Sequence, residues 1–410
     1  MKETVRTYPI DSSALIHLAV HNRQHSNVFR LEVHLRNGID PAKLQRAADI
    51  AAACFPMLAA GIRKERNHFA VVPCPERLNI RVDRELLAYM SEQEIGDCAM
   101  RVLYGRHHVA VELFHSLTDG AGGLQFLKVL LAEYLDVPLE LPPEKRAWED
   151  SYKKYAAGKA TALPGGNSCL LPPAPLENSA VCRTTWRISA KELQSKLQGT
   201  KITVTAFFTA LFAKAAMDLQ KAGRSPGEKL LPARVMVPVD LRRRFPSVSA
   251  RNFSLYVLPQ LTPEAAEAPL SGIAENMAAQ IRIGASRLKG MAAANALLER
   301  RTSLLPLGMK CAALKAGFEF YGGRSSCITV SNLGRVDLPE GVRQEITRLD
   351  FMLTPRMHSP YNCGIATVDD TLSLTVTRRG AEKGLEKMIA AQLERSGLKL
   401  SAVKSENVLK

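Results

Sequence analysis

One short segment of the sequence combines residue types that suit acid–base chemistry. His115 follows an alternating run from Val109 to Phe114 that predicts a strand, and Asp119 and Gly120 follow four and five residues after it. An imidazole titrates near neutral pH, so His115 at a strand end could take a proton from an alcohol or amine as that group attacks. Four residues of loop are too few for Asp119 to reach back easily. We expect Asp119 to turn away and to brace the loop through an arginine.

The pattern His-x-x-x-Asp-Gly after a strand resembles the CoA-dependent acyltransferase superfamily. That superfamily includes chloramphenicol acetyltransferase, the condensation domains of peptide synthetases, and bacterial alcohol acetyltransferase-like and polyketide-associated acyltransferases. The resemblance implies that His115 is the catalytic base, Asp119 a structural carboxylate and Gly120 the loop glycine. Condensation domains usually carry a second histidine directly before the first, where this sequence has Phe114. This difference favours a stand-alone acyltransferase over a peptide-bond-forming domain.

The second half of the sequence resembles the alcohol acetyltransferase-like members of the same superfamily. A strand there ends in proline and Val239-Asp240-Leu241-Arg242, and Arg251-Asn252 precedes the next strand. Ser331-Asn332-Leu333-Gly334 resembles a segment that those proteins place beside a tunnel. The resemblance implies an α+β pseudodimer of two chloramphenicol-acetyltransferase-like lobes, with mixed β-sheets flanked by helices and a tunnel between the lobes. The Asp-Phe-Gly-Trp-Gly sequence of the plant families is absent, which argues against a plant-type enzyme.

The second half of the sequence should supply two further groups, an oxyanion donor and a partner for Asp119. The candidates for an oxyanion donor facing His115 are Asn252, Ser331 and Asn332, although each could equally be a turn residue that bonds its own backbone. Arg242 is the expected partner of Asp119, because a guanidinium and a carboxylate fit as a fork. Arg243, Arg244 and Arg251 are rivals, and an exposed run of charge is the alternative for most of them.

The segment around His115 has three other interpretations. A dinucleotide-binding turn would need glycine where the sequence has Gln125. Metal binding would draw on His107, His108 and His115, but strand alternation puts His108 on the other face and no carboxylate lies at a familiar ligand spacing, so we expect no metal site. His115 could also be purely structural.

Length and composition describe an ordinary globular protein. The chain has 410 residues, 46% of them hydrophobic and 23% charged, which is enough for two domains. No uncharged segment is long enough to span a bilayer, and the first residues lack the apolar run of a secretory signal. The eight cysteines are scattered without a C-x-x-C pair, as in a reduced protein. We therefore expect a cytoplasmic protein without an integral membrane segment.

The formal net charge of +15 favours an anionic partner, although a solvated basic surface is an equal alternative. The partner could be the phosphates of CoA, an acidic acyl carrier protein or an anionic membrane face. Nucleic acid is disfavoured, because no basic run is interleaved with stacking aromatic residues.

A proline-rich stretch from 138 to 175 separates the two halves. It predicts a crossover with a short helix near 148–157, between an N-terminal lobe over residues 1–165 and a C-terminal lobe over residues 166–410. Periodicity predicts strands at 28–35, 68–72, 100–104, 182–188, 233–239, 253–258, 327–330, 363–368 and 372–377, and helices after Asp40, at 124–134, at 205–219, over much of 269–318 and at the C-terminus.

The sequence as a whole predicts an acyltransferase that moves an acyl group from acyl-CoA to a small alcohol or amine, with the alcohol favoured. His115 would deprotonate the acceptor and then protonate the departing thiolate, without an acyl-enzyme. No G-x-S-x-G nucleophile elbow occurs. We expect no permanently bound cofactor; acyl-CoA, or an acyl-phosphopantetheine, is a co-substrate. The alternatives are an enzyme fed by an acyl carrier protein and a non-catalytic condensation-like binding module.

Overall fold

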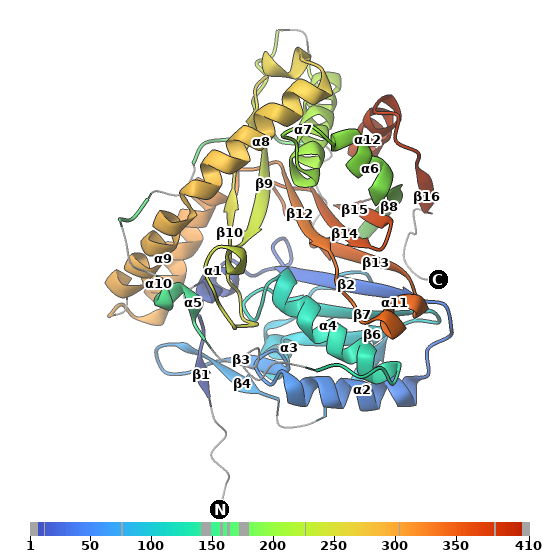
Figure 1. Cartoon of the computed structure of the whole chain (residues 1–410). Helices are drawn as coiled ribbons and strands as arrows, with labels where there is room; N and C mark the ends of the chain where they lie inside the picture. The colour runs from blue at the N-terminus through green and yellow to red at the C-terminus, as the bar shows by residue number, and fades with distance from the viewer. Residues whose placement is uncertain are drawn as a thin grey trace, which may run out of the picture.

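Two mixed β-sheets, each with helices on one face, make up most of the protein (Figure 1). The computed structural model describes residues 7–11, 13–74, 77–140, 149–155, 159–161, 165–171, 180–225, 227–302, 304–380 and 383–403. The architecture is α+β, as the sequence predicted. In the part of the chain described, no helix is both long enough and apolar enough to cross a membrane.

The first sheet has five strands in the order β13-β2-β7-β6-β5. They are β13 (Ile346–Leu353), β2 (Val28–Leu35), β7 (His108–Phe114), β6 (Met100–Tyr104) and β5 (Ile80–Val82). β6 and β7 form the predicted antiparallel hairpin. One face of the sheet packs on α2 (Pro41–Cys54) and α4 (Gly120–Tyr134), whose broad apolar faces contact each other and the sheet.

The opposite face of the first sheet is charged and yet buried. In β2 the odd residues enter the apolar core, whereas Arg30 and Glu32 point to the other side and are at most 1% exposed. Arg30 pairs with Glu32 and, from neighbouring segments, with Asp83 and Glu112. Arg183 on β8 (Val181–Ser189), in the second sheet, also reaches Glu32 at 2.6 Å. Ion pairs therefore join the charged face to the other half of the molecule.

The edge strand β13 comes from the second half of the chain and joins the first sheet. Its pairing with β2 runs from Ile346 opposite Leu35 to Leu353 opposite Phe29. The sequence patterns predicted no strand here. β13 belongs to the predicted C-terminal lobe by its position in the sequence, but it pairs with a strand of the predicted N-terminal lobe. The division of the chain at residue 165 therefore stays a prediction.

The second sheet has the strand order β10-β9-β12-β14-β15-β8-β16, and β11 pairs with β9. Its remaining strands are β9 (Ala233–Asp240), β10 (Ser254–Val257), β11 (Gln260–Leu261), β12 (Ile328–Arg335), β14 (Tyr361–Val368), β15 (Thr371–Arg379) and β16 (Ser401–Val403). β12 runs parallel to both neighbours, whereas β14 and β15 form the predicted hairpin. α7 (Val204–Ala222) lies on β9 and β12, beside α8 (Leu270–Ser286) and α12 (Gly384–Arg395).

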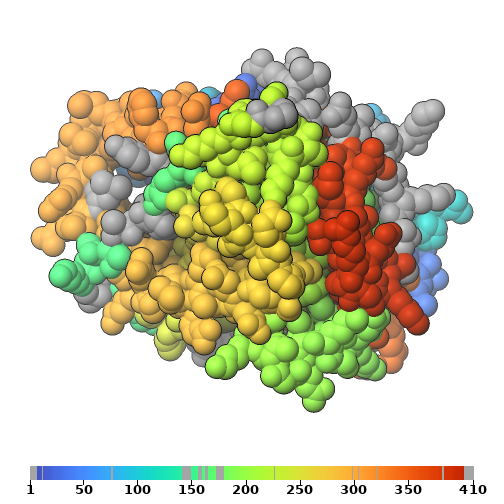
Figure 2. All heavy atoms as spheres, turned by 90° about the horizontal axis from the view of Figure 1, so that it is seen from above, coloured from blue at the N-terminus to red at the C-terminus, as the bar shows by residue number. Residues whose placement is uncertain are grey.

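Smaller elements complete the fold. A third sheet has the order β1-β4-β3. Seen from above, α12 lies at one side of the molecule and the orange residues of α10 at the other (Figure 2). The predicted helix near 148–157 is α5, limited to Ser151–Lys154; residues 148 and 156–158 lie outside the described residues. The remaining bounds are β1 (Tyr8–Pro9), β3 (Ala60–Lys64), β4 (Phe69–Pro73), α1 (Ala14–Ala19), α3 (Glu92–Asp97), α6 (Ala190–Leu197), α9 (Leu288–Thr302), α10 (Leu307–Gly317) and α11 (Glu340–Glu345).

The close approach of β14 to β13 requires glycine at position 364, and this generates a stability prediction. A Cβ on Gly364 would lie 1.9 Å from the carbonyl oxygen of Phe351, so Gly364→Ala must push two backbones apart. We expect a loss of about 3 kcal/mol in the free energy of unfolding, measured by chemical denaturation. The control is Gly272→Ala on α8, where a Cβ meets nothing within 4 Å. It should stabilise the protein by about 0.5–1 kcal/mol, and equal effects of the two changes would contradict the packing.

Candidate active site

His115 lies at the end of β7, one residue beyond the last strand pair between Phe114 and Val28. Its backbone N–H donates to the carbonyl of Asn27 at 2.9 Å, which fixes the chain as it leaves the sheet. The side chain is partly buried, and its ring contacts Phe29 edge-on with centroids 5.4 Å apart. The strand thus presents the imidazole at its end.

Asp119 turns away from His115 and connects the two halves of the chain. It caps α4 by accepting from the N–H of Gly122 at 3.0 Å, and it accepts from the N–H of Phe253 at 2.7 Å. One guanidinium nitrogen of Arg242 donates to its carboxylate, at 2.9 Å from Oδ2 and 3.2 Å from Oδ1. Burial alone would raise the pKa of Asp119, but Arg242 and these backbone donors outweigh it and hold the pKa below its ordinary value.

Arg242 is the one of the four candidate arginines whose side chain the structure brings to Asp119. It also donates to Asp240 at 2.9 Å and to the carbonyls of Ser249 and Arg251. These bonds hold the segment between β9 and β10 in a fixed shape around the guanidinium. The loop that carries Asp119, in the first half of the chain, therefore binds the hydrogen-bonded segment around Arg242 in the second half.

The same loop approaches the second half closely at Ala250. The Thr118 hydroxyl donates to the Ala250 carbonyl at 2.6 Å. A Cβ on Gly122 would lie 2.0 Å from the same oxygen, so only glycine fits there. At Gly120, the first residue of α4, a Cβ would lie 2.9 Å from a methyl group of Leu333. The glycines after the histidine thus allow close packing between the two halves.

Asn252 lies directly beside the ring of His115. Its side-chain nitrogen is 3.4 Å from Nδ1 and 3.4 Å from the backbone oxygen of His115, and its oxygen accepts from the Ser254 hydroxyl. The ring also forms a hydrogen bond with its own backbone. These contacts engage the Nδ1 side, and among the described residues Nε2 has no hydrogen-bond partner. Nε2 is then the nitrogen that can take up a proton.

The other two candidate donors lie elsewhere in the second sheet. Ser331 pairs with Gly364 in the ladder between β12 and β14. The amide nitrogen of Asn332 donates to the Thr205 hydroxyl at 3.1 Å, and its oxygen accepts from the N–H of Gly334. No contact of either residue with His115 occurs in the described part of the chain, so Asn252 is the one of the three that the structure brings to the histidine.

Sequence reasoning missed a second histidine at this site. His17 on α1 stacks on His115, with ring centroids 4.6 Å apart and planes at 13°. The side chain of Asn27 donates to the backbone carbonyl of His17, so the same residue holds both histidines. α1 has six residues and no motif. The one available signal was the spacing of His17, His21 and His25, four residues apart.

Both histidines are held in the neutral form. Burial lowers the pKa of His115 below its ordinary 6.5, and the charge of Arg356 lowers it further, against Asp119 and the backbone hydrogen bond, which raise it. Burial lowers the pKa of His17 well below 6.5, and so do the charges of His115 and Arg356. Arg356 was not predicted from the sequence either. At neutral pH the stacked pair is uncharged, which is the state that a base requires.

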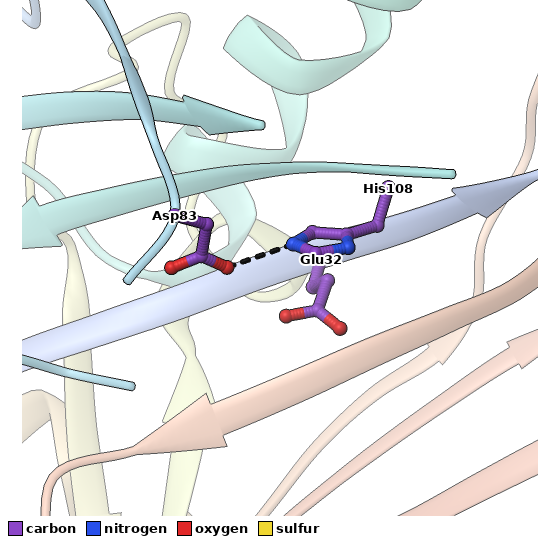
Figure 3. Close-up of side chains that lie close together, drawn as sticks. All are labelled: Glu32, Asp83 and His108. Atoms are coloured by element: carbon purple, nitrogen blue, oxygen red, sulfur yellow. Dashed lines mark hydrogen bonds and ion pairs between the residues drawn. The ribbon is translucent and has the colours of Figure 1, made fainter. Parts of the chain in front are cut away.

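Two groups of possible metal ligands occur among the described residues, both on the charged face of the first sheet. They are Glu32, Asp83 and His108 (Figure 3), and Glu32, His34 and Asp350. His108 bonds Asp83 at 2.8 Å, while Arg30 contacts both carboxylates of the first group. Because guanidinium groups already supply the counter-charge, a cation would have to displace them. The expectation of no metal stays a prediction.

The fold is that of solved acetyltransferases and of a peptide synthetase. F. graminearum TRI101, solved with coenzyme A and deoxynivalenol, matches with a TM-score of 0.64 and 12% identity over 97% of this chain and 100% of its own. TRI3 trichothecene 15-O-acetyltransferase from F. sporotrichioides matches with a TM-score of 0.61 and 13% identity, over 95% and 94%. This chain shares the fold of CoA-using acetyltransferases. The sequence matches no protein-family model and no curated protein.

The nonribosomal peptide synthetase FmoA3 has the same fold over part of its length. It matches with a TM-score of 0.63 and 17% identity, over 96% of this chain. This chain spans 42% of the length of that synthetase. The comparison agrees with the predicted resemblance to a superfamily that includes domains of peptide synthetases as well as acetyltransferases.

The contacts of Asp119 predict that its negative charge stabilises the folded protein. In Asp119→Asn, either orientation of the amide turns its NH₂ toward a donor, namely the N–H of Phe253 or that of Gly122. We expect a loss of about 2–3 kcal/mol in the free energy of unfolding by urea denaturation. The control is Asp136→Asn, since Asp136 is exposed, pairs with Lys43 at the surface and has a positive φ that asparagine tolerates. A loss of under about 1 kcal/mol is expected there, and a similar loss for Asp119→Asn would rule out the bracing role.

Proposed function

We propose that this protein transfers an acyl group from an acyl-CoA thioester to a hydroxyl group, or an amine, of a small acceptor. The observation that carries the proposal is His115 at a strand end, with Nε2 free, the Nδ1 side engaged by Asn252 and the following loop tied down by Asp119 and Arg242. Its support is the fold, which this chain shares over nearly its whole length with acetyltransferases solved with coenzyme A. A pseudodimer with a tunnel between its lobes belongs to the same proposal.

The reaction proceeds by direct transfer. Nε2 of His115 takes the proton of the acceptor hydroxyl while the acceptor oxygen attacks the thioester carbonyl carbon. The resulting tetrahedral oxyanion collapses, the C–S bond breaks, and the protonated His115 returns its proton to the leaving thiolate. The ester and free CoA are the products. No acyl-enzyme forms, so no nucleophilic serine or cysteine is required.

Two neighbours assist the base in this proposal. Asn252 is the candidate oxyanion donor, because its amide nitrogen lies beside His115 and its contacts with His115 are long, at 3.4 Å; one such donor is typically worth about 10²–10³ in rate. His17 holds the plane of the imidazole by stacking, so it is a positioning residue. Ser331 and Asn332 are weaker candidates for the donor, since the structure does not bring them to His115.

The donor could instead be loaded on an acyl carrier protein. The net charge of +15 and the likeness to part of a peptide synthetase favour this second candidate. It uses the same chemistry at His115, because CoA and a carrier protein both present the acyl group on phosphopantetheine. A non-catalytic condensation-like module remains the third reading. A cytoplasmic location is part of the proposal for a CoA-using enzyme.

Removal of the base tests the proposal. His115→Ala should lower acceptor-dependent thiol release by about 10²–10⁴-fold, because water must then accept the proton in place of the imidazole. The measurement is thiol release from acetyl-CoA and longer acyl-CoAs with a panel of alcohols and amines, followed by the same assay with loaded carrier protein. The control is His68→Ala, at an exposed histidine of the third-sheet hairpin. Turnover that survives His115→Ala would refute the role of the base, and wild-type silence with both donors would leave the binding-module reading.

The lowered pKa of His115 predicts an unusual pH profile. Because the neutral ring is the active form and burial lowers its pKa, the acid limb of kcat/KM should be centred below pH 6.5. Burial has the largest effect on this pKa and lowers it; Arg356 also lowers it, whereas Asp119 raises it. The measurement is kcat/KM for the best acceptor across the acid range. An acid limb that is centred above pH 6.5 would contradict the burial of the base.

A further inference from the structure

Arg356 is partly buried, and among the described residues no carboxylate neutralises it, as is also true of Arg187 and Arg234. The six buried arginines each have a carboxylate within 4.0 Å; they are Arg30, Arg101, Arg183, Arg251, Arg348 and Arg378. The only side-chain contacts of the Arg356 guanidinium among the described residues are Thr329 Oγ1 at 3.4 Å and Met236 Sδ at 3.9 Å. Both contacts are made by one nitrogen of the guanidinium, so most of its five N–H donors have no acceptor among the residues that the structure describes.

The backbone holds Arg356 firmly at the end of β13. Its N–H donates to the carbonyl of Ser359 at 2.9 Å, and the N–H of Ser359 donates back at 3.1 Å. Asn362 donates to the carbonyl of Thr354, and the Thr354 hydroxyl donates to Val28 at the start of β2. The loop is therefore braced on both sheets, and the guanidinium is presented from a rigid base.

The position of Arg356 is next to the proposed site. β7, β2 and β13 are neighbouring strands, and His115 and Thr354 each bond the start of β2, at Asn27 and Val28. Arg356 follows Thr354 by two residues, and its charge lowers the pKa of both His17 and His115. These connections place Arg356 in the same region of the fold as the base. The phosphates of CoA are not its ligand, because the pantetheine arm keeps them far from the thioester.

Tyr256 supplies a second unused polar group beside Arg356. It lies on β10, opposite Pro238, on a partly exposed face of the sheet that also includes Met236. Its hydroxyl has no hydrogen-bond partner among the described residues, and it is the one charged or titratable neighbour that favours the charge on Arg356. A guanidinium and a phenol without acceptors form a ready site for a carboxylate, which needs donors on both oxygens.

We propose that Arg356, assisted by Tyr256, binds a carboxylate of the substrate beside His115. The inference rests on the proposed acyl transfer and specifies its substrate class. The carboxylate belongs either to the acceptor, which is then a hydroxy acid or an amino acid, or to a dicarboxylic acyl group such as malonyl or succinyl. In both cases the substrate carboxylate neutralises Arg356, which no carboxylate of the described residues does. The ion pair also orients the reacting atoms.

The experiment separates the two sources of the carboxylate. One arm measures thiol release from acetyl-CoA with hydroxybutyrate, hydroxybenzoate and aminobutyrate, each against its neutral amide. The other arm offers benzyl alcohol with malonyl-CoA and succinyl-CoA against propionyl-CoA and butyryl-CoA. We expect the acid to exceed its neutral analogue by about 10- to 100-fold in kcat/KM in one arm. Arg356→Gln should abolish this preference, so that the acid and its neutral analogue have similar kcat/KM values, while Arg66→Gln, at an exposed site, should preserve it.

The possible failures are distinguishable. Transfer that requires His115 but ignores the carboxylate in both arms overturns this inference and leaves the proposed function standing. Equal losses on acid and neutral substrates in Arg356→Gln also overturn it, because they indicate a purely structural role. If no pair turns over, the proposed function fails, and binding decides the inference: hydroxybutyrate and succinate should shift the ring resonances of His115 and His17 by NMR in the wild type and not in Arg356→Gln. Absence of that shift overturns the carboxylate site.

Discussion

The ion pair between Asp119 and Arg242 is the interaction on which the site depends. Asp119 belongs to the loop after β7 and Arg242 to the segment after β9, so the pair joins the two sheets within a few residues of His115. Every oxygen of the carboxylate accepts from the loop, from Arg242 or from the start of β10. Because one buried carboxylate orders all three segments, the base and its neighbour Asn252 are positioned together.

A second constraint is the burial of charge between the halves. The first sheet turns an apolar face to α2 and α4 and a charged face to the rest of the protein. Such a face is stable only if every ion is paired, and removing one partner leaves a costly buried charge. Arg183 reaches Glu32 from β8, so the pairing also fixes how the second sheet meets the first. The specificity of the arrangement comes from this network as much as from the apolar cores.

The sequence predicted the elements around the motif because their signals are local. The segment of β7 alternates, and α4 has a wide apolar face. β13 escaped prediction although Arg348 and Asp350 alternate with core residues as in a half-buried strand. Its partner β2 is far away in the chain, so no local pattern shows which sheet it joins. His17 and Arg356 lie outside any motif. Tertiary packing brings α1 and the segment after β13 to this region, and such packing cannot be read from local patterns.

The charges around the base work together. Stacked imidazoles cannot both carry a proton at low cost, and the unneutralised Arg356 lowers the pKa of both. Burial and Arg356 therefore keep His115 neutral but make it a weak base. A carboxylate bound at Arg356 would cancel that charge, so the pKa of His115 would rise toward its ordinary value once the substrate is in place. A base with a pKa nearer the working pH removes a proton more effectively. The same guanidinium would thus select an acidic substrate and strengthen the base only after that substrate has bound.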